Sequence, residues 1–292
     1  MHDGAGAASA DVDRWIDRVD ETLAPPEVFV RINELADDPF GAAPRIEQAI
    51  EDDPALKARL LAILNSRYFA FPSNIDSISR AMAVLGAREL RDLVLVETAV
   101  RTFGRLDNPI VGLSEFWQHS LYCAVVAHLI AERRREERPE QFFAIGLFHD
   151  IGSLLLFRNL PELSRECLRQ AAASGGDLDR LEEHRIGFSH SQIGAALASR
   201  WGLPPHAIEA IRWHHRPLRA PRHRVEAALI HIAEHVTESG AVVGGPASRR
   251  CVDPRAWSLV GLTLRQFEGL FDEVNEKFEA VRALLFADMI AA

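Results

Sequence analysis

The sequence has very little lysine. Lys57 and Lys277 are the only two, and arginine supplies the rest of the 33 basic residues. Against 42 acidic residues, this leaves a formal net charge of −9. A chain with this balance lacks the positive surface that general binding to nucleic acids or to anionic membranes requires. We therefore expect no general binding to nucleic acids and no membrane among its partners, while a nucleotide ligand is possible.

Cysteine is also scarce, and long apolar runs are missing. Cys123, Cys167 and Cys251 are the only cysteines and stand far apart, without a Cys-x-x-Cys pair. An odd, unclustered set is typical of a reducing compartment. No uninterrupted apolar run approaches the ~20 residues of a membrane span, and the N-terminus lacks the basic and apolar parts of a signal peptide. These absences predict a soluble, cytoplasmic protein.

Apolar residues recur at helical rather than strand spacing. Leu56, Leu60 and Leu64 repeat every fourth residue, which places them on one face of a helix. Asp53 and Pro54 precede them, and these residue types are favoured at the N-cap and at the first helical position. No Asn-Gly pair marks a hairpin. Similar patterns along the chain predict an all-α protein of about a dozen helices.

The helical pattern thins where Gly104, Asn108-Pro109 and Gly112 follow one another, which predicts a boundary between two helical lobes. We expect three parts in chain order. Residues 1–20 would form a flexible or partly helical tail, residues 21–108 an N-terminal helical lobe, and residues 109–292 a second helical lobe that includes a C-terminal helix.

The pair His149-Asp150 is the first candidate for chemistry. It lies in the segment 144–152, in which seven of nine residues are apolar or glycine, on a helix expected over 142–157. An ionisable pair buried there without partners would cost several kcal/mol. A divalent metal would satisfy both groups, since imidazole and carboxylate are good ligands for Zn, Mn or Fe. Hydrogen bonds to neighbouring helices would also satisfy them.

Other ligand-type residues lie on separate expected helices. His119 shares an inward face with Phe116 and Cys123. His190 lies in the first turn of a helix for which Ser189 and Gln192 predict a capping box. A set spread over several helices is much more specific than one pair. In chain order the candidates are His119, His149-Asp150, His190, His214-His215 and Glu234.

This order of residues resembles the HD superfamily of metal-dependent phosphohydrolases, and is most similar to its HDOD family, the regulatory branch found in bacterial signalling proteins. The resemblance covers about 25–238. It implies an N-terminal lobe packed on an HD-like helical bundle. The segments that carry it are 53–66, 78–91, 116–120, 146–152 and 200–204.

The resemblance also implies the roles of the candidate ligands. One divalent metal would be held by His119, His149, Asp150 and Glu234. Asp150 would bridge to a second metal, held by His190, His214 and His215. The metal would be Fe, Mn or Zn, and no organic cofactor is expected.

Two functions follow from the resemblance. The first is a signal-transduction module that interacts with a signalling protein or senses a ligand, with any bound metal structural. The alternative is a metal-dependent phosphohydrolase for a nucleotide or cyclic dinucleotide, with Asp150 in catalysis. We rank the signalling module first because no lysine stands beside the site to bind phosphate, and Arg212 and Arg216 are the flanking cations.

Two departures from the family pattern bear on that choice. The superfamily usually closes its metal site with an aspartate, where this chain has Glu234. The branch that hydrolyses cyclic di-GMP has a Gly-Tyr-Pro motif after its paired histidines, where this chain continues Arg216-Pro217-Leu218.

Three further residues or patterns have competing explanations. Glu115, four residues before His119, could join a metal site, or simply complement the helix dipole. Cys123 could be a soft ligand or a buried structural cysteine. The segment 231–235 reads His-x-x-Glu-His, a pattern of some zinc proteases that also arises easily by chance.

Overall fold

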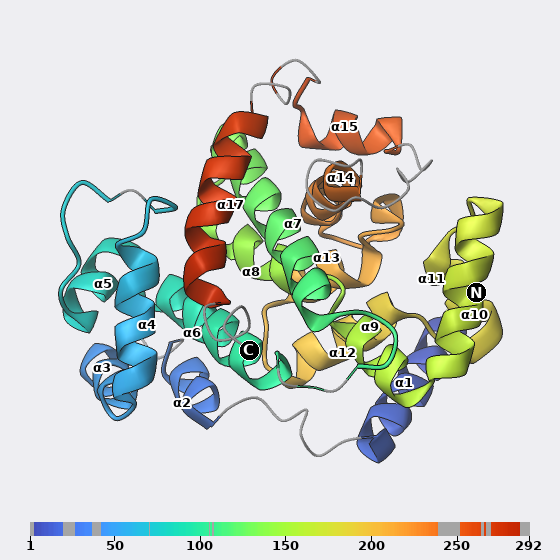
Figure 1. Cartoon of the computed structure of the whole chain (residues 1–292), viewed down its shortest axis with the longest axis horizontal. Helices are drawn as coiled ribbons and strands as arrows, with labels where there is room; N and C mark the ends of the chain where they lie inside the picture. The colour runs from blue at the N-terminus through green and yellow to red at the C-terminus, as the bar shows by residue number, and fades with distance from the viewer. Residues whose placement is uncertain are drawn as a thin grey trace. The chain divides into compact units, whose positions relative to one another are not determined.

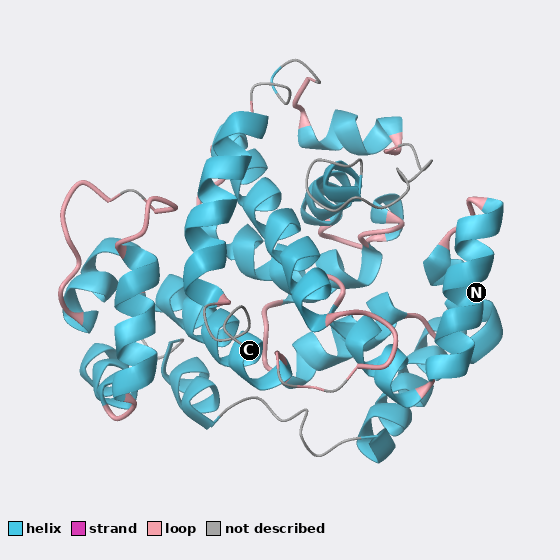
Figure 2. Ribbon diagram, in the orientation of Figure 1, coloured by secondary structure: helices cyan, strands magenta, loops and turns pink. Residues whose placement is uncertain are grey.

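The fold is that of a computed structural model, which describes residues 3–19, 27–36, 42–69, 71–104, 106, 108–238, 252–263, 266 and 270–286. Every element within these residues is a helix, and none is a strand (Figure 1). Figure 2 shows the secondary structure by colour, with the helices in cyan. The predicted all-α fold class is confirmed.

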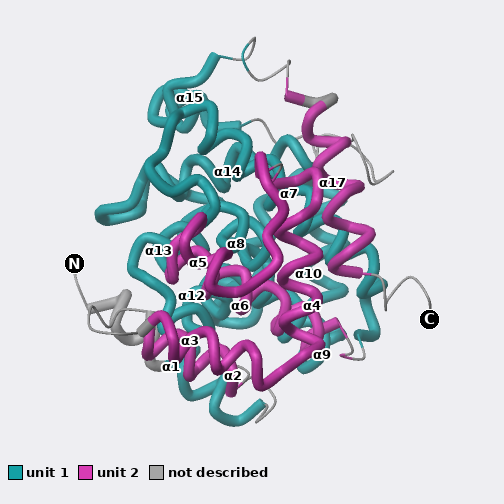
Figure 3. The backbone as a smooth tube through the Cα atoms, turned by 90° about the vertical axis from the view of Figure 1, so that its left-hand side faces the viewer, with its two compact units in different colours: residues 1–24, 107–267 teal, residues 25–106, 268–292 magenta. Residues whose placement is uncertain are grey.

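The chain divides into two compact units (Figure 3). Unit 1 comprises Met1–Ala24 and Asp107–Phe267, and unit 2 comprises Pro25–Leu106 and Glu268–Ala292. The units to which the two ends of the chain belong therefore differ from the lobes expected from the sequence. The N-terminal segment, expected as a separate tail, belongs to unit 1, and the C-terminal helix, expected in the second lobe, belongs to unit 2.

Unit 2 contains six helices with described bounds. The helix that begins at Pro54 is capped by the residue before it. The Asp53 carboxylate accepts hydrogen bonds from the backbone N–H groups of Ala55 and Leu56, at 3.1 and 3.0 Å. The predicted cap is thus confirmed. The helices are α2 (Glu27–Ala36), α3 (Ala42–Glu51), α4 (Pro54–Leu64), α5 (Ile78–Leu85), α6 (Ala87–Phe103) and α17 (Phe271–Leu285).

The C-terminal helix α17 belongs to unit 2 because its apolar face packs on α4. Val274, Phe278 and Val281 recur at helical spacing and are buried. Lys277 donates from Nζ to the carbonyl oxygen of Tyr68 at 3.0 Å, across 209 residues of sequence. Helical periodicity predicts that such a helix has a buried face, but not which partner covers it.

Unit 1 contains the candidate ligands. In it α7 packs on α8 and α14, α12 packs on α9 and α13, and α10 packs on α9 and α11. The helices are α1 (Asp3–Val19), α7 (Leu113–Arg134), α8 (Glu140–Phe148), α9 (Ile151–Asn159), α10 (Pro161–Ser174), α11 (Leu178–Ile186), α12 (His190–Arg200), α13 (Pro205–Trp213), the short 3₁₀ helix η2 (Pro217–Arg219), α14 (Arg224–Glu238) and α15 (Pro254–Val260).

The N-terminal helix α1 is attached to α12 of the same unit. Val12 and Ile16 are buried, and Arg200 of α12 pairs with Asp17 at 2.8 Å. Arg200 also donates to the backbone carbonyl of Asp13 at 2.9 Å. An apolar stripe with flanking ion pairs explains why this segment is part of unit 1.

The most apolar part of unit 1 is the segment 140–159. By length and composition alone it could cross a membrane, with a mean hydropathy of 1.2, but 83% of it is buried inside the protein. It is therefore core. The prediction of a single helix over 142–157 is wrong, because the chain forms two helices, α8 and α9, separated at His149-Asp150.

Two glycines bring this break close to its neighbours. A Cβ atom at Gly146 would lie 2.7 Å from the backbone Cα of Ala124 in α7. A Cβ atom at Gly152 would overlap the carbonyl oxygen of His190 in α12. Only glycine permits such close backbone contacts. The break between α8 and α9 is therefore held directly against the helices that carry His119 and His190.

We expect Gly152→Ala to lower the free energy of unfolding by about 3 kcal/mol, because the added methyl group forces α9 and α12 apart. Gly112→Ala is the control, since the nearest atoms to its new methyl group belong to the Glu115 side chain at 3.6 Å or more. The control should change stability by about 1 kcal/mol or less. Equal denaturation midpoints for the two variants would contradict the close approach.

Candidate metal centre

Two of the candidate histidines lie at the ends of their own helices. Nδ1 of His149 bonds the carbonyl oxygen of Gly146 at 2.7 Å, and Nδ1 of His214 bonds that of Ile211 at 2.7 Å. In an unbroken helix these carbonyls would accept from backbone N–H groups four residues later. A carbonyl can only accept, so Nδ1 of each ring carries the proton. Nε2, with its lone pair, is left as the ligand atom.

These Nε2 atoms face the carboxylate of Asp150. Nε2 of His149 is 3.4 Å from Oδ2, and Nε2 of His214 is 3.6 Å from Oδ1. Neither Nε2 atom, nor Oδ1 of Asp150, has a hydrogen-bond partner, although all three are buried. Buried polar atoms in proteins are almost always bonded. Metal ions bound at Asp150 would satisfy these three atoms, since His149 and His214 each share a ligand group with Asp150.

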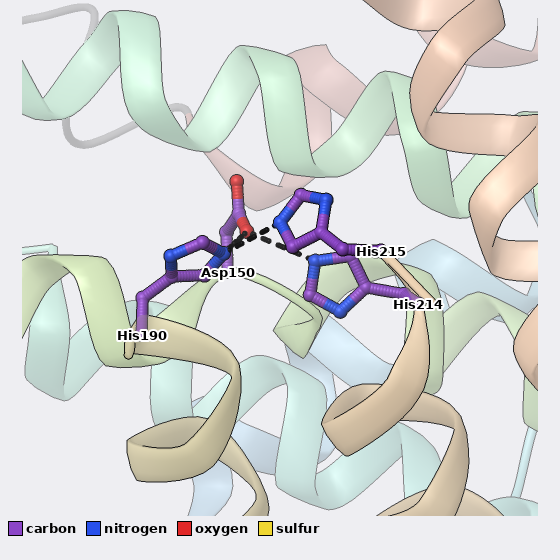
Figure 4. A group of neighbouring side chains, drawn as sticks. All are labelled: Asp150, His190, His214 and His215. Carbon is purple, nitrogen blue, oxygen red and sulfur yellow. Dashed lines mark hydrogen bonds and ion pairs between the residues drawn. The ribbon is translucent and has the colours of Figure 1, made fainter. Parts of the chain in front are cut away.

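The ligand atoms form two groups that share Asp150, and within each group they lie within 4.8 Å of one another. The smaller group is His119, His149 and Asp150. The larger group is Asp150, His190, His214 and His215, drawn in Figure 4. Six of the seven predicted ligands thus come together, from α7, the α8–α9 break, α12 and the end of α13.

Within the larger group, two rings meet each other. Nε2 of His190 lies 3.4 Å from Oδ1 of Asp150 and 2.8 Å from Nε2 of His215. Two imidazole nitrogens at that distance must share a proton. A metal ion would take the place of this proton, because a metal binds the neutral ring through its lone pair.

The seventh candidate, Glu234 of α14, is buried near the larger group. Its Oε2 atom is 3.5 Å from Nδ1 of His215 and 3.9 Å from Nε2 of His214. It also forms a third group of possible ligands with His231 and His235. Its expected role beside His119 and His149 stays a prediction.

Burial and charge set opposite pKa values within the site. Burial would lower the pKa of His190, but the charge and hydrogen bond of Glu182, together with Asp150, raise it to about 10. Burial is the largest of the causes that lower the pKa of His214 to about 3. Burial would raise the pKa of Asp150, but His149 and the other histidines hold it well below its usual range. The site is thus built around an ionised aspartate.

The remaining candidates are placed clearly. Glu115 is exposed and belongs to neither group. Cys123 is fully buried beside His149, and burial raises the pKa of its thiol. In the His-x-x-Glu-His segment, both ring nitrogens of His231 are used: Nδ1 bonds the carbonyl oxygen of His214 at 2.8 Å, and Nε2 accepts from the Asp253 backbone N–H at 3.2 Å. A metal held by the group of His231, Glu234 and His235 would have to displace one of these two bonds.

The sequence missed the acidic face of α11, formed by Asp179, Glu182 and Glu183. Glu182 bonds His190, and Gln192 donates to Glu183 at 2.8 Å instead of completing the predicted capping box. The start of α12 was predicted correctly, but Ser189 makes no capping bond there. The spacing of these three acids, which places them on one helix face shortly before His190, could have indicated the contact. Acidic residues at helical spacing usually face solvent, however.

Comparisons with known proteins agree with this architecture. The family model of the HDOD domain matches residues 23–217. The chain therefore belongs to the HDOD family.

A relative from Treponema pallidum (strain Nichols), an uncharacterized protein, is 27% identical over 206 residues, which cover 70% of this chain and 40% of that protein. The chain thus spans less than half the length of this curated relative.

Solved structures show the same fold. An HDOD domain protein of unknown function from Geobacter sulfurreducens superposes with a TM-score of 0.77 at 24% identity, covering 96% of this chain and 99% of that one. A proposed phosphohydrolase from Shewanella amazonensis SB2B gives a TM-score of 0.72 at 22% identity, covering 92% and 97%.

The geometry predicts how metal content responds to substitution. We expect Asp150→Ala to abolish transition-metal binding, because it removes the ligand that both groups share. Glu115→Ala should keep the wild-type metal content. Mass spectrometry of protein reconstituted with Mn, Fe or Zn measures both. Equal retention in the two variants would place the metal elsewhere, and the His231–His235 segment would be the next place to look.

Proposed function

We propose that this protein is a regulatory HDOD module whose helical bundle in unit 1 is held together by a divalent transition metal at Asp150. The observation that carries the proposal is the convergence of three buried ligand atoms without hydrogen-bond partners, on His149, Asp150 and His214. The two groups draw ligands from α7, the α8–α9 break, α12 and α13. Occupancy of the site would therefore fix how these helices pack, which a signalling partner can detect.

The flanking arginines favour a regulatory role over catalysis. Arg216 donates to Asp179 and to Glu183, so its guanidinium is directed at α11. Arg212 lines a hollow formed by α1, α12 and α13. Arg216 is therefore already paired with carboxylates of α11, and its charge is used there. The partner that this role requires is a signalling protein, and the two free buried cysteines, Cys123 and Cys167, suit a cytoplasmic location.

We expect metal to raise the thermal stability of the protein. At a free metal concentration of about 100 times the Kd, binding should add about 2.7 kcal/mol to the free energy of unfolding, or roughly 5–10 °C in Tm. Scanning calorimetry with and without Mn²⁺ measures the shift. Asp150→Ala should show none. An unchanged Tm in the wild type, at a concentration where metal is shown to bind, would contradict a structural role.

One observation favours the second candidate, a metal-dependent phosphohydrolase. The side chains of His119 and Asp150 are 25% and 20% exposed, whereas that of His214 is fully buried. One edge of the site is thus open to a small ligand such as a nucleotide. A divalent metal would supply Lewis acidity and a lowered pKa for bound water. His119 and Asp150 would orient the ligand at that edge.

We expect no useful turnover of cyclic di-GMP by the metal-loaded protein. The Gly-Tyr-Pro motif is missing, the longer Glu234 stands where the superfamily usually has an aspartate, and Arg216 is bound to α11. Chromatography of the dinucleotide after incubation measures the products. Linear product at a few turnovers per second, the ordinary range of enzymes, would overturn the regulatory role if Asp150→Ala abolished it.

A further inference from the structure

The helix α11 presents an acidic face to the larger ligand group. Asp179 and Glu182 are each only 1% exposed, and Glu183 lies beside them on the same face. Buried carboxylates are costly unless they are bonded. All three are bonded, and their partners belong to the start of α12 or to Arg216, which directly follows His214-His215.

Glu182 makes the contact that matters most for the ligands. Its Oε2 atom accepts from the backbone N–H of His190 at 2.9 Å and pairs with Nδ1 of the same residue at 2.6 Å. An ionised carboxylate can only accept, so Nδ1 carries the proton and Nε2 faces Asp150 and His215. His149 and His214 achieve the same orientation through backbone carbonyls. His190 is thus oriented by a charged side chain.

A second contact fixes the other side of the group. Arg216 donates to Glu183 from Nη1 at 3.0 Å and from Nη2 at 2.5 Å, and also to Asp179. Asp179 in turn accepts from the Ser191 hydroxyl at 2.5 Å. One helix therefore anchors both chain segments that carry His190 and His215.

We propose that Glu182 is a positioning residue that sets the tautomer and direction of His190, and that α11 thereby controls the geometry of the larger ligand group. This inference rests on the proposed metal site. In the smaller group, His149 is oriented by Gly146 of its own helix. Carboxylates behind metal-bound histidines typically contribute 10–100-fold to metal affinity.

The test compares Glu182→Gln, which removes the charge and keeps the shape, with Glu162→Gln in α10, whose parent side chain is 86% exposed. Full-length, metal-free protein is titrated with Co²⁺ and followed by visible absorption. We expect two binding phases in the wild type and in the control. In Glu182→Gln one phase should weaken about 10–100-fold, while the other is unchanged. Glu182→Asp, which keeps the charge, should recover part of the lost affinity.

A second readout does not need a metal. In ¹⁵N-labelled, metal-free protein, His190 should show a strongly deshielded Nδ1–H proton, assigned by its loss in His190→Ala, and Glu182→Gln should remove or shift it. Unchanged Co²⁺ affinity with an unchanged proton signal would overturn the inference. A wild type that binds no Co²⁺ would overturn the metal site itself, and the proton signal would still decide whether Glu182 positions His190.

Discussion

The bond from Nδ1 of His149 to the carbonyl oxygen of Gly146 determines how the rest of the site is arranged. It occupies the acceptor that would continue α8, so the helix ends and Asp150 leaves the helical path before α9 begins. It also fixes the tautomer, which leaves Nε2 facing the carboxylate. His214 repeats this geometry at the end of α13. A histidine that ends its own helix therefore serves both as a C-terminal cap and as an oriented ligand.

A metal ion would remove the cost of leaving these atoms unbonded. A buried polar atom without a hydrogen bond or a ligand would cost about 1–3 kcal/mol, and the atoms concerned are on His149, Asp150 and His214. Unpartnered groups of this kind occur mainly at functional sites. The tight backbone contacts at Gly146 and Gly152 hold α8 against α7 and α9 against α12, so packing fixes the position of the site.

The sequence predicts those parts of the fold that depend on near neighbours. The Asp53 cap and the inward face of His119 follow from local pattern. The break at His149-Asp150 does not, because helical periodicity continues through it and the competing acceptor is the histidine's own side chain. The pairing of α17 with α4 and the bond from Glu182 to His190 depend on tertiary packing, which gives no signal in local spacing.

Anomalous X-ray diffraction, recorded at the absorption edge of the metal on crystals of the reconstituted protein, tests the central claim most directly. The account predicts density bound by the Asp150 carboxylate together with Nε2 of His149 or of His214. With both groups filled, it predicts two peaks that share Asp150. A metal held instead by His231 and His235, or bound with no contact to Asp150, would contradict the account.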